Sequence, residues 1–405
     1  MPTFLSACRG AKHMKSRLLF TCLAAALTLA AQKVDTSTLN GKVLFGYQGW
    51  FECAPSWRHW ARGVPTPESL VVDMYPDLRE FDPADLCLVP GMNAYLFTAE
   101  NPRIVLRHFE WMRDYGLDGI LLQRFVTDIS RRRAGGDVVL KNVMAAAAAT
   151  GRTFAIEYDI SGARPDTFAQ QLLDDWTYLV ETLKVTAHPN YLHHKGKPVL
   201  SVWGMGLSDV AKHPPARPED ALALIRRLKE TVTFIGGTPA RWRTLRADAA
   251  TDPGWTAVYR AMDVVQPWTV GRYRNETQAD AWRKDVLEPD LAELRKHRQE
   301  YMPVIFPGFS WHNLNREAPE NAIPRNGGEF LLRQAANARA AGATMLKIAM
   351  FDEVNESTAM FKVTSHREDA PKPGFWLTLD ADGRDLPSDW YLRLAGQITR
   401  DFHRR

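Results

Sequence analysis

The sequence predicts an α/β fold, a single (β/α)8 barrel. From residue 42 onward, short apolar strands alternate with amphipathic or alanine-rich helical stretches, which is typical of parallel β/α units. The strands are apolar almost throughout, as expected where helices cover both faces of a parallel sheet. There are eight such strands, the number in this barrel. A doubly wound open sheet is the alternative fold.

The predicted strands are short runs rich in β-branched and aromatic residues. In chain order they cover residues 43–48, 119–125, 153–159, 198–204, 232–237, 263–268, 303–309 and 344–351. The stretches between them carry the helical pattern, and several end on glycine, a residue typical of helix C-termini. These helical stretches cover residues 102–116, 138–151, 168–184, 218–230, 280–301 and 329–342.

Two connections are longer than a barrel unit requires. Residues 51–102 follow the first strand, and residues 359–386 follow the last strand and are expected to hold a small β element. Long loops at this end of a barrel usually carry function. No linker divides the chain, so residues 32–405 are predicted to form one domain.

The N-terminus has the pattern of a signal peptide, residues 1–31. Two cations precede an uncharged run from Leu18 to Ala31 that ends in small residues. This run is shorter than the roughly 20 apolar residues that a membrane-spanning helix needs. The protein is therefore expected to be secreted or periplasmic, without integral membrane association. A loose lipoprotein-like tetrad ends at Cys22, and the sequence leaves its lipidation open.

Charge and cysteine content bear on nucleic-acid binding and on a disulfide. The formal net charge is +4, but residues 1–31 contribute four cations and no acid, so the rest of the chain has no basic field for nucleic acid. Outside that segment only Cys53 and Cys87 remain. In an oxidising compartment a disulfide between them is possible, and two unpaired buried thiols are the alternative.

The carboxyl ends of the strands are the expected position of an active site in such a barrel. The side chains expected there are Tyr47, Gln48, Trp50, Gln123, Arg124, Asp159, Trp203, Gln266, Trp268, Trp311 and His312. Indole rings pack on the apolar faces of sugars, while amide, guanidinium and carboxylate groups bind hydroxyls. The set predicts an oligo- or polysaccharide substrate, although each residue alone also fits ordinary packing.

Two glutamates follow the last strand, within MLKIAMFDEVNEST at residues 345–358. Glu353 and Glu356 are three residues apart, which places both on one side of a turn, whereas Asp352 is expected to point elsewhere. Two neighbouring carboxylates can divide into a general acid and a general base, as glycoside cleavage requires. The alternative is that these acids only cap the helix that follows.

Three motifs carry a resemblance to a known family. They are GYQGWF with WRHW (46–51 and 57–60), KGKPVLSVWG (195–204) and FDEVNES (351–357). With these motifs the chain resembles bacterial proteins of the glycoside hydrolase family 71/99-like group. That group is related to the endo-α-mannosidases and endomannanases of family 99 and the α-1,3-glucanases of family 71.

The resemblance implies a reaction and a role for each glutamate. It implies hydrolysis of an α-linked mannan- or glucan-like glycan with retention. Glu353 would help to deprotonate the sugar 2-hydroxyl, and Glu356 would act as general acid and base. Val354 stands where family 99 has tryptophan, so one aromatic platform is missing.

No metal or organic cofactor is predicted. His188, His193 and His194 lie in a loop without the spacing of metal ligands. The alternative function is a non-catalytic carbohydrate-binding protein that uses the same tryptophans on the same barrel.

Overall fold

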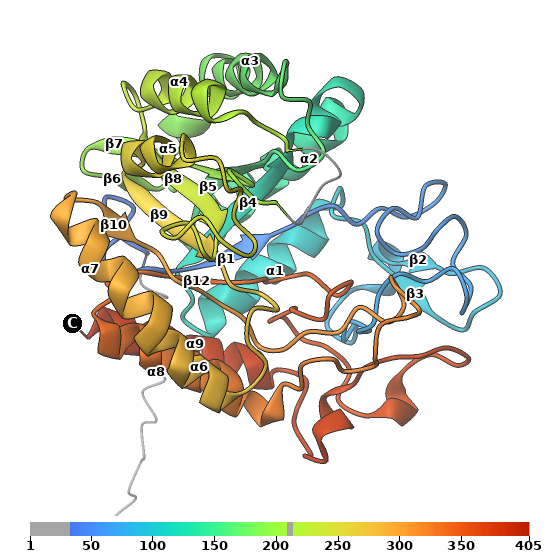
Figure 1. Cartoon of the computed structure of the whole chain (residues 1–405). Helices are drawn as coiled ribbons and strands as arrows, with labels where there is room; N and C mark the ends of the chain where they lie inside the picture. Colours follow the sequence, from blue (N-terminus) through green and yellow to red (C-terminus); the bar gives the residue numbers. More distant parts are fainter. Residues whose placement is uncertain (1–32, 209–213, 405) are drawn as a thin grey trace, which may run out of the picture.

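The parallel strands of the chain curl into a barrel that is covered by helices on its outside (Figure 1). The computed structural model describes residues 33–208 and 214–404. The predicted signal peptide, with Cys22, lies outside the described residues. The predicted (β/α)8 barrel is confirmed.

The barrel has eight strand positions, all of which were predicted. Seven are single strands: β1 Val43–Tyr47, β4 Gly119–Phe125, β5 Thr153–Asp159, β7 Lys197–Trp203, β8 Thr233–Pro239, β9 Val264–Trp268 and β12 Leu346–Ile348. The eighth consists of β10 (Glu300–Tyr301) and β11 (Val304–Ile305). Met302 and Pro303 separate them, and Pro303 has no N–H for a ladder bond. Because β10 pairs with β9 and β11 pairs with β12, this segment closes the barrel.

Helices follow the strands in turn. They are α1 Pro102–Asp114, α2 Val126–Thr150, α3 Phe168–Glu181, α4 Pro218–Leu228, α5 Trp255–Ala261, α6 Glu276–Trp282, α7 Glu288–Lys296, α8 Glu329–Ala341 and α9 Trp390–His403. Helices α5 and α9 were not predicted. Helix α2 begins before residue 138 because its first turns, which include three arginines and two glycines, lack the apolar period. In the described residues no helix has both the length and the apolar character to cross a membrane.

The two long connections lie at the mouth of the barrel. The first holds the short helix η1 (Pro83–Asp85) and the hairpin of β2 (Cys87–Leu88) and β3 (Tyr95–Leu96). A disulfide joins Cys53 to Cys87, so the paired alternative is the correct one. The second holds η5 (Arg367–Asp369) and η6 (Leu379–Asp382), and its described residues 359–386 contain no strand. The small β element expected there amounts to one isolated antiparallel bridge, between Val363 and Pro76.

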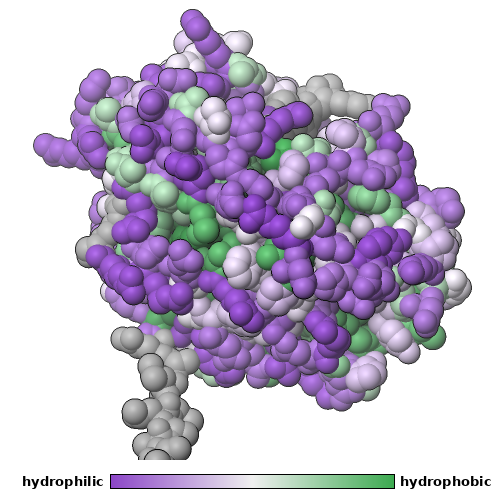
Figure 2. Space-filling model, turned by 90° about the horizontal axis from the view of Figure 1, so that it is seen from below, coloured by the Kyte–Doolittle hydropathy of each residue, from purple (hydrophilic) through white to green (hydrophobic). Residues whose placement is uncertain are grey.

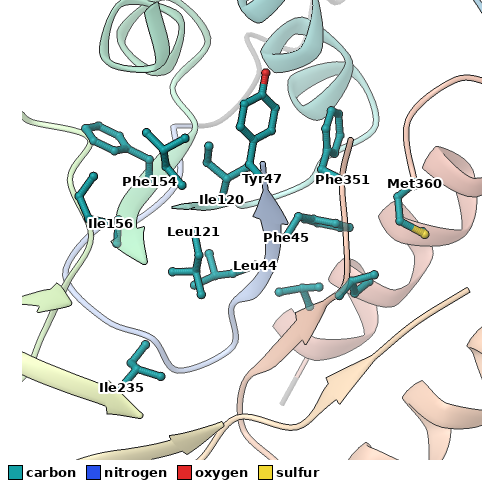
Figure 3. Packing of buried hydrophobic residues seen from close by; sticks show 14 of the residues in the cluster. Leu44, Phe45, Tyr47, Ile120, Leu121, Phe154, Ile156, Ile235, Phe351 and Met360 are labelled. Carbon is teal, nitrogen blue, oxygen red and sulfur yellow. The ribbon is translucent and has the colours of Figure 1, made fainter. Parts of the chain in front are cut away.

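Alternation along the strands decides which side chains reach the inside of the barrel. Figure 3 shows Leu44, Leu121 and Ile235 inside the ring of strands, whereas the ring of Tyr47 points toward the helices. Phe45 packs edge to face on Phe351, with ring centroids 6.2 Å apart. The face seen from below is largely hydrophilic around a band of apolar side chains (Figure 2), as expected where most apolar residues are buried in the core.

Candidate active site

The loop that follows β12 is attached to the carboxyl end of β1. The carboxylate of Asp352 accepts hydrogen bonds from the backbone N–H groups of Gln48 (2.7 Å) and Gly49 (2.9 Å). Burial raises the pKa of Asp352 to about 6. Asp352 therefore has a structural partner of its own, and the loop after it lies at the C-terminal mouth of the barrel.

Glu353 and Glu356 form an interacting pair in this loop. Glu353 is 5% exposed and Glu356 is half-buried. Burial raises the pKa of Glu353 well above its ordinary value, the charge of Glu356 raises it further, and the side chain of Gln48 opposes this shift. Burial also raises the pKa of Glu356, to about 7. Both shifts favour the retention of a proton by the pair, which is the state that an acid and base pair needs.

Residues between the two glutamates fix the loop. The amide of Asn355 donates to the carbonyl oxygens of His59 (2.8 Å) and Val71 (3.2 Å). The carbonyl of Val354 accepts from the backbone N–H of Asp73 at 3.0 Å, and the Val354 side chain is fully buried. The glutamates are therefore held by the long connection after β1, and Val354 offers no surface to a substrate.

Asp73, which sequence reasoning missed, joins three loops of the mouth. Its buried carboxylate accepts from the hydroxyl of Ser310 (2.5 Å) and from the backbone N–H groups of His312 (2.8 Å) and Asn313 (2.6 Å). The backbone N–H of Ser310 in turn donates to the carbonyl of Glu356 at 3.1 Å. In the sequence Asp73 lies within VVDMYP, an apolar stretch with one acid. The expected burial of this single carboxylate is the only signal that could have identified it.

Sequence reasoning also missed Arg325, which binds the backbone of the loop after β12. Its Nη2 donates to the carbonyl oxygens of Ser357 (2.9 Å) and Ala359 (2.6 Å), and its guanidinium lies 4.3 Å from the ring centroid of Tyr391. The side chain is 5% exposed, and burial lowers its pKa. No sequence pattern distinguishes this arginine, because its partners are backbone carbonyls.

One wall of the mouth carries Asp159, Trp203 and Trp268. Strand register places Asp159 beside Trp203, and the two indole rings meet edge to face at 5.4 Å and 80°. Asp159 accepts from the N–H (2.7 Å) and hydroxyl (2.5 Å) of Ser161, and burial raises its pKa to about 6. Gly237 makes room for this wall, since a Cβ there would lie 2.7 Å from the Trp203 Cα.

A buried polar network lies inside the barrel. Lys347 Nζ donates to both carboxylate oxygens of Glu157 and, at 3.2 Å, to Oε1 of Gln266. The amide nitrogen of Gln266 is 3.2 Å from the sulfur of Met302. Because both ends of its amide are occupied and its side chain is fully buried, the position of Gln266 does not fit the predicted substrate contact.

Trp311 and His312 lie on the loop after β11. Both are half-buried. The His312 ring nitrogen Nδ1 is 2.8 Å from the carbonyl of Ala318, and its ring meets Phe375 edge to face at 5.2 Å. Since Ser310 of the same loop bonds Glu356, these two side chains belong to the loop that contacts the glutamates.

Gln48, Trp50 and Gln123 line a cavity of about 270 Å³ between the ends of β1 and β4 and the start of α2. Gln48 Oε1, Trp50 Nε1 and Gln123 Oε1 are buried and have no hydrogen-bond partner in the described part of the chain. Trp50 stacks on His59 with ring centroids 3.7 Å apart, so its ring is not an open platform. Unpaired buried polar atoms are costly, and sugar hydroxyls would satisfy them.

Two residues that were predicted to contact the substrate bind other protein side chains instead. Tyr47 points out of the barrel, is fully buried, and its hydroxyl is 2.9 Å from Nδ1 of His108, so the predicted substrate contact is wrong. Arg124 borders the cavity, but its guanidinium is bound by Asp175 (2.5 and 2.8 Å) and Asp137 (3.0 Å). Strand alternation explains both, since positions 47 and 124 face the helices.

Within residues 33–208 and 214–404, no cluster of three or more His, Cys, Asp or Glu side chains is arranged to hold a metal ion. No family model matches the sequence, and no curated protein sequence matches it either.

Solved structures do match the chain. A GH99 endo-α-mannosidase from Bacteroides thetaiotaomicron matches with 17% identity over 91% of this chain and 98% of that one, at a TM-score of 0.65, in its complex with Bis-Tris propane. A second structure of that enzyme matches with 16% identity over 91% and 99%, at a TM-score of 0.66. A glycoside hydrolase-like protein matches with 14% identity over 84% and 98%, at a TM-score of 0.55. These matches confirm the barrel and its likeness to the family 99 fold.

Proposed function

We propose that this chain is a glycoside hydrolase that cleaves an α-linked glycan, with Glu353 and Glu356 as its catalytic carboxylates. The observation that carries this proposal is the pair itself. Two interacting carboxylates, both with raised pKa values, lie at the mouth of a barrel that shares its fold with a GH99 endo-α-mannosidase. Their burial would be unfavourable without a function that uses it.

The environment of each glutamate suits a different role. Glu356 is the more exposed of the two and is suited to protonate the leaving glycosidic oxygen. Glu353 lies deeper, where burial raises its pKa and the hydrogen bond from Gln48 opposes that rise by favouring the charged form. Its likeness in position to the first carboxylate of family 99 assigns it the base that takes the proton of the sugar 2-hydroxyl. The 2-oxygen then bonds to C1 as the C1–O bond to the leaving group breaks. Water next attacks C1 and passes a proton to Glu356, while the bond between C1 and the 2-oxygen breaks and Glu353 returns its proton to the 2-oxygen, so configuration is retained.

The proposed substrate is a mannan- or glucan-like glycan. Trp203 and Trp268 are the aromatic side chains best placed to contact sugar rings, beside Asp159. The cavity next to Gln48 offers hydrogen-bonding atoms on the other side of the pair. With Val354 buried, no aromatic side chain stands between the glutamates, and this favours a sugar specificity different from that of an enzyme with tryptophan there.

The experiment that tests the proposal uses the purified mature protein, Glu356→Gln and Glu230→Gln. Glu230 is an exposed glutamate before β8 and serves as the matched control. Each protein is incubated with α-mannans, α-1,3-glucans and mixed polysaccharides, and released oligosaccharides are measured. Products from the wild type and Glu230→Gln alone are expected. Retention of one polysaccharide by all three proteins, without products, would favour the non-catalytic carbohydrate-binding protein.

Residues 32–405 are proposed to act as one domain after export, with the segment 1–31 removed. The N-terminal sequence of protein recovered from the periplasm or medium tests this directly. A mature chain that begins before residue 20 would contradict it.

A further inference from the structure

His59, within the WRHW segment at residues 57–60, is a half-buried residue beside the loop that holds the two glutamates. Its carbonyl oxygen accepts a hydrogen bond of 2.8 Å from the side-chain amide of Asn355. Asn355 stands between Glu353 and Glu356 in the chain. The backbone of His59 is therefore one hydrogen bond away from the loop that carries the proposed catalytic pair.

The imidazole of His59 is the outer member of a stack of three rings. Trp50 is the middle ring, with His59 at a centroid distance of 3.7 Å and an interplanar angle of 6° and with Phe125, at the end of β4, at 5.4 Å and 21°. Phe51 is nearly equidistant from Trp50 (6.3 Å) and His59 (6.4 Å), so it lies at the side of the stack. Among the described rings, none covers the imidazole face turned away from Trp50. The stack thus fixes the plane of the imidazole and leaves its outer face without an aromatic partner.

The backbone at His59 has a conformation that residues other than glycine rarely adopt. Its φ angle is +62°, and that of Trp57 is +48°, so both lie in the left-handed region. Such conformations persist where surrounding contacts hold them, and they cluster at active sites and ligand-binding sites. At this turn the contacts are the bond from Asn355 and the bond from the N–H of Trp60 to the carbonyl of Trp57 at 3.0 Å. The orientation of His59 is therefore maintained at the expense of backbone strain.

Both ring nitrogens of His59 are available to a ligand. In the part of the chain that the structure describes, no hydrogen bond joins either of them to another residue. Burial and the nearby charges of Arg58 and Arg132 lower the pKa of His59 to about 3, so the ring is neutral at physiological pH. A neutral imidazole offers one N–H donor and one acceptor nitrogen. A sugar hydroxyl, which can also donate and accept, matches this pair of groups.

We propose that His59 is a substrate-binding residue whose imidazole forms a hydrogen bond with a hydroxyl of the sugar unit beside the two glutamates. A neutral sugar is the expected partner, because Arg58 is already paired with Asp128 and Arg132 with Glu52. This inference rests on the proposed function, since it takes the glutamate pair as the place where the glycan binds.

Two substitutions separate a substrate contact from a packing role. His59→Phe keeps a ring to stack on Trp50 but has no nitrogen, whereas His59→Gln has a donor and an acceptor but no ring. Each is introduced into Glu356→Gln, and retardation in native gels that contain α-mannan or α-1,3-glucan gives the dissociation constant. His59→Phe should weaken binding about threefold to tenfold, because one hydrogen bond is lost, and His59→Gln should recover part of the affinity. His297→Phe, which changes an exposed histidine directly after α7, should bind as Glu356→Gln does.

The reverse order, with normal binding by His59→Phe and weaker binding by His59→Gln, would show that the ring only packs on Trp50 and would overturn the proposal. Equal binding by all variants would overturn it too, as would the absence of retardation of Glu356→Gln in both polysaccharides. Assays with an intact Glu356 distinguish this failure from that of the proposed function. Products from the wild type with an unchanged KM in His59→Phe would remove His59 from the site and leave the hydrolase in place. Binding weakened by His59→Phe, without products from the wild type, would support the contact in a carbohydrate-binding protein.

Discussion

The carboxylate of Asp73 accepts a hydrogen bond from the backbone N–H of Asn313 at 2.6 Å, across 240 positions of sequence. This contact joins the connection after β1 to the loop after β11. The backbone N–H of Asp73 also donates to Val354, between the two glutamates, at 3.0 Å. One buried aspartate thus holds together three loops that form the mouth of the barrel.

Asp73→Asn is expected to weaken the contacts between the loops at the mouth of the barrel. An amide has only one acceptor oxygen and brings two N–H donors, so at least one of the three donors that face Asp73 loses its partner. The expected loss of unfolding free energy is about 1 to 3 kcal/mol, and kcat/KM should fall about tenfold or more. Thermal denaturation and steady-state kinetics measure both. Asp385→Asn, whose side chain is 91% exposed, is the control, and equal behaviour of the two variants would refute this role.

Arg325 is predicted to act as a positioning residue for Glu356. Arg325→Met removes both hydrogen bonds to the carbonyl groups of residues 357 and 359, so the turn after Glu356 loses its support. We expect kcat to fall about tenfold or more, which corresponds to an activation free energy higher by about 1.4 kcal/mol. KM should change less than about threefold. Arg325→Lys keeps a donor and should recover part of kcat. A purely structural role would instead lower melting temperature in both variants while kcat per folded molecule stayed constant.

The sequence was sufficient for the barrel and for the position of the two glutamates after its last strand, because both depend on local pattern. Apolar runs of strand length identified all eight strand positions. The carboxylates directly after the last run identified the loop that holds Glu353 and Glu356. Asp73 and Arg325 depend on contacts between distant loops, which no local pattern records. Tyr47 was misassigned because strand alternation places Gln48, and not its neighbour, on the inner face of β1.

The activity is expected to fall in acid. Burial raises the pKa of Glu356 to about 7 and that of Glu353 well above its ordinary value, so both carboxyls become protonated as the pH falls and no base is available. Below pH 6 kcat/KM should fall about tenfold per pH unit. A pH profile of kcat/KM on the polysaccharide that is cleaved measures this. A profile that is flat or rises toward pH 5 would contradict the raised pKa values.

The same pair should make the wild type less stable at high pH. Burial raises the pKa of Glu356 from 4.5 to about 7, so the folded state binds this proton more tightly than the unfolded state. The resulting stability is fully present below about pH 4.5 and is lost as pH rises through about 7. Glu356→Gln cannot ionise, so its melting temperature should decline by a few degrees less between pH 5 and 8. Glu230→Gln should follow the wild type, and a parallel decline in Glu356→Gln would exclude this linkage.

Gln48 and Gln123 offer a matched pair for separating substrate binding from control of the base. Both line the cavity with an unpaired amide oxygen, but only Gln48 also faces Glu353. Gln123→Leu should raise KM several-fold and leave the pH profile unchanged, because it removes only a partner for the substrate. Gln48→Leu should raise KM and also raise the pKa of Glu353, since the side chain that favours the charged carboxylate is gone.

The expected result for Gln48→Leu is a shift of the acidic limb of kcat/KM toward higher pH, together with a lower kcat. The direction follows from linkage, because a base that is harder to ionise needs a higher pH to reach its charged form. Full pH profiles of both variants and the wild type make the comparison. Identical shifts in the two variants would show that the cavity acts on the pair as a whole, and an unshifted Gln48→Leu would show that its amide does not control Glu353.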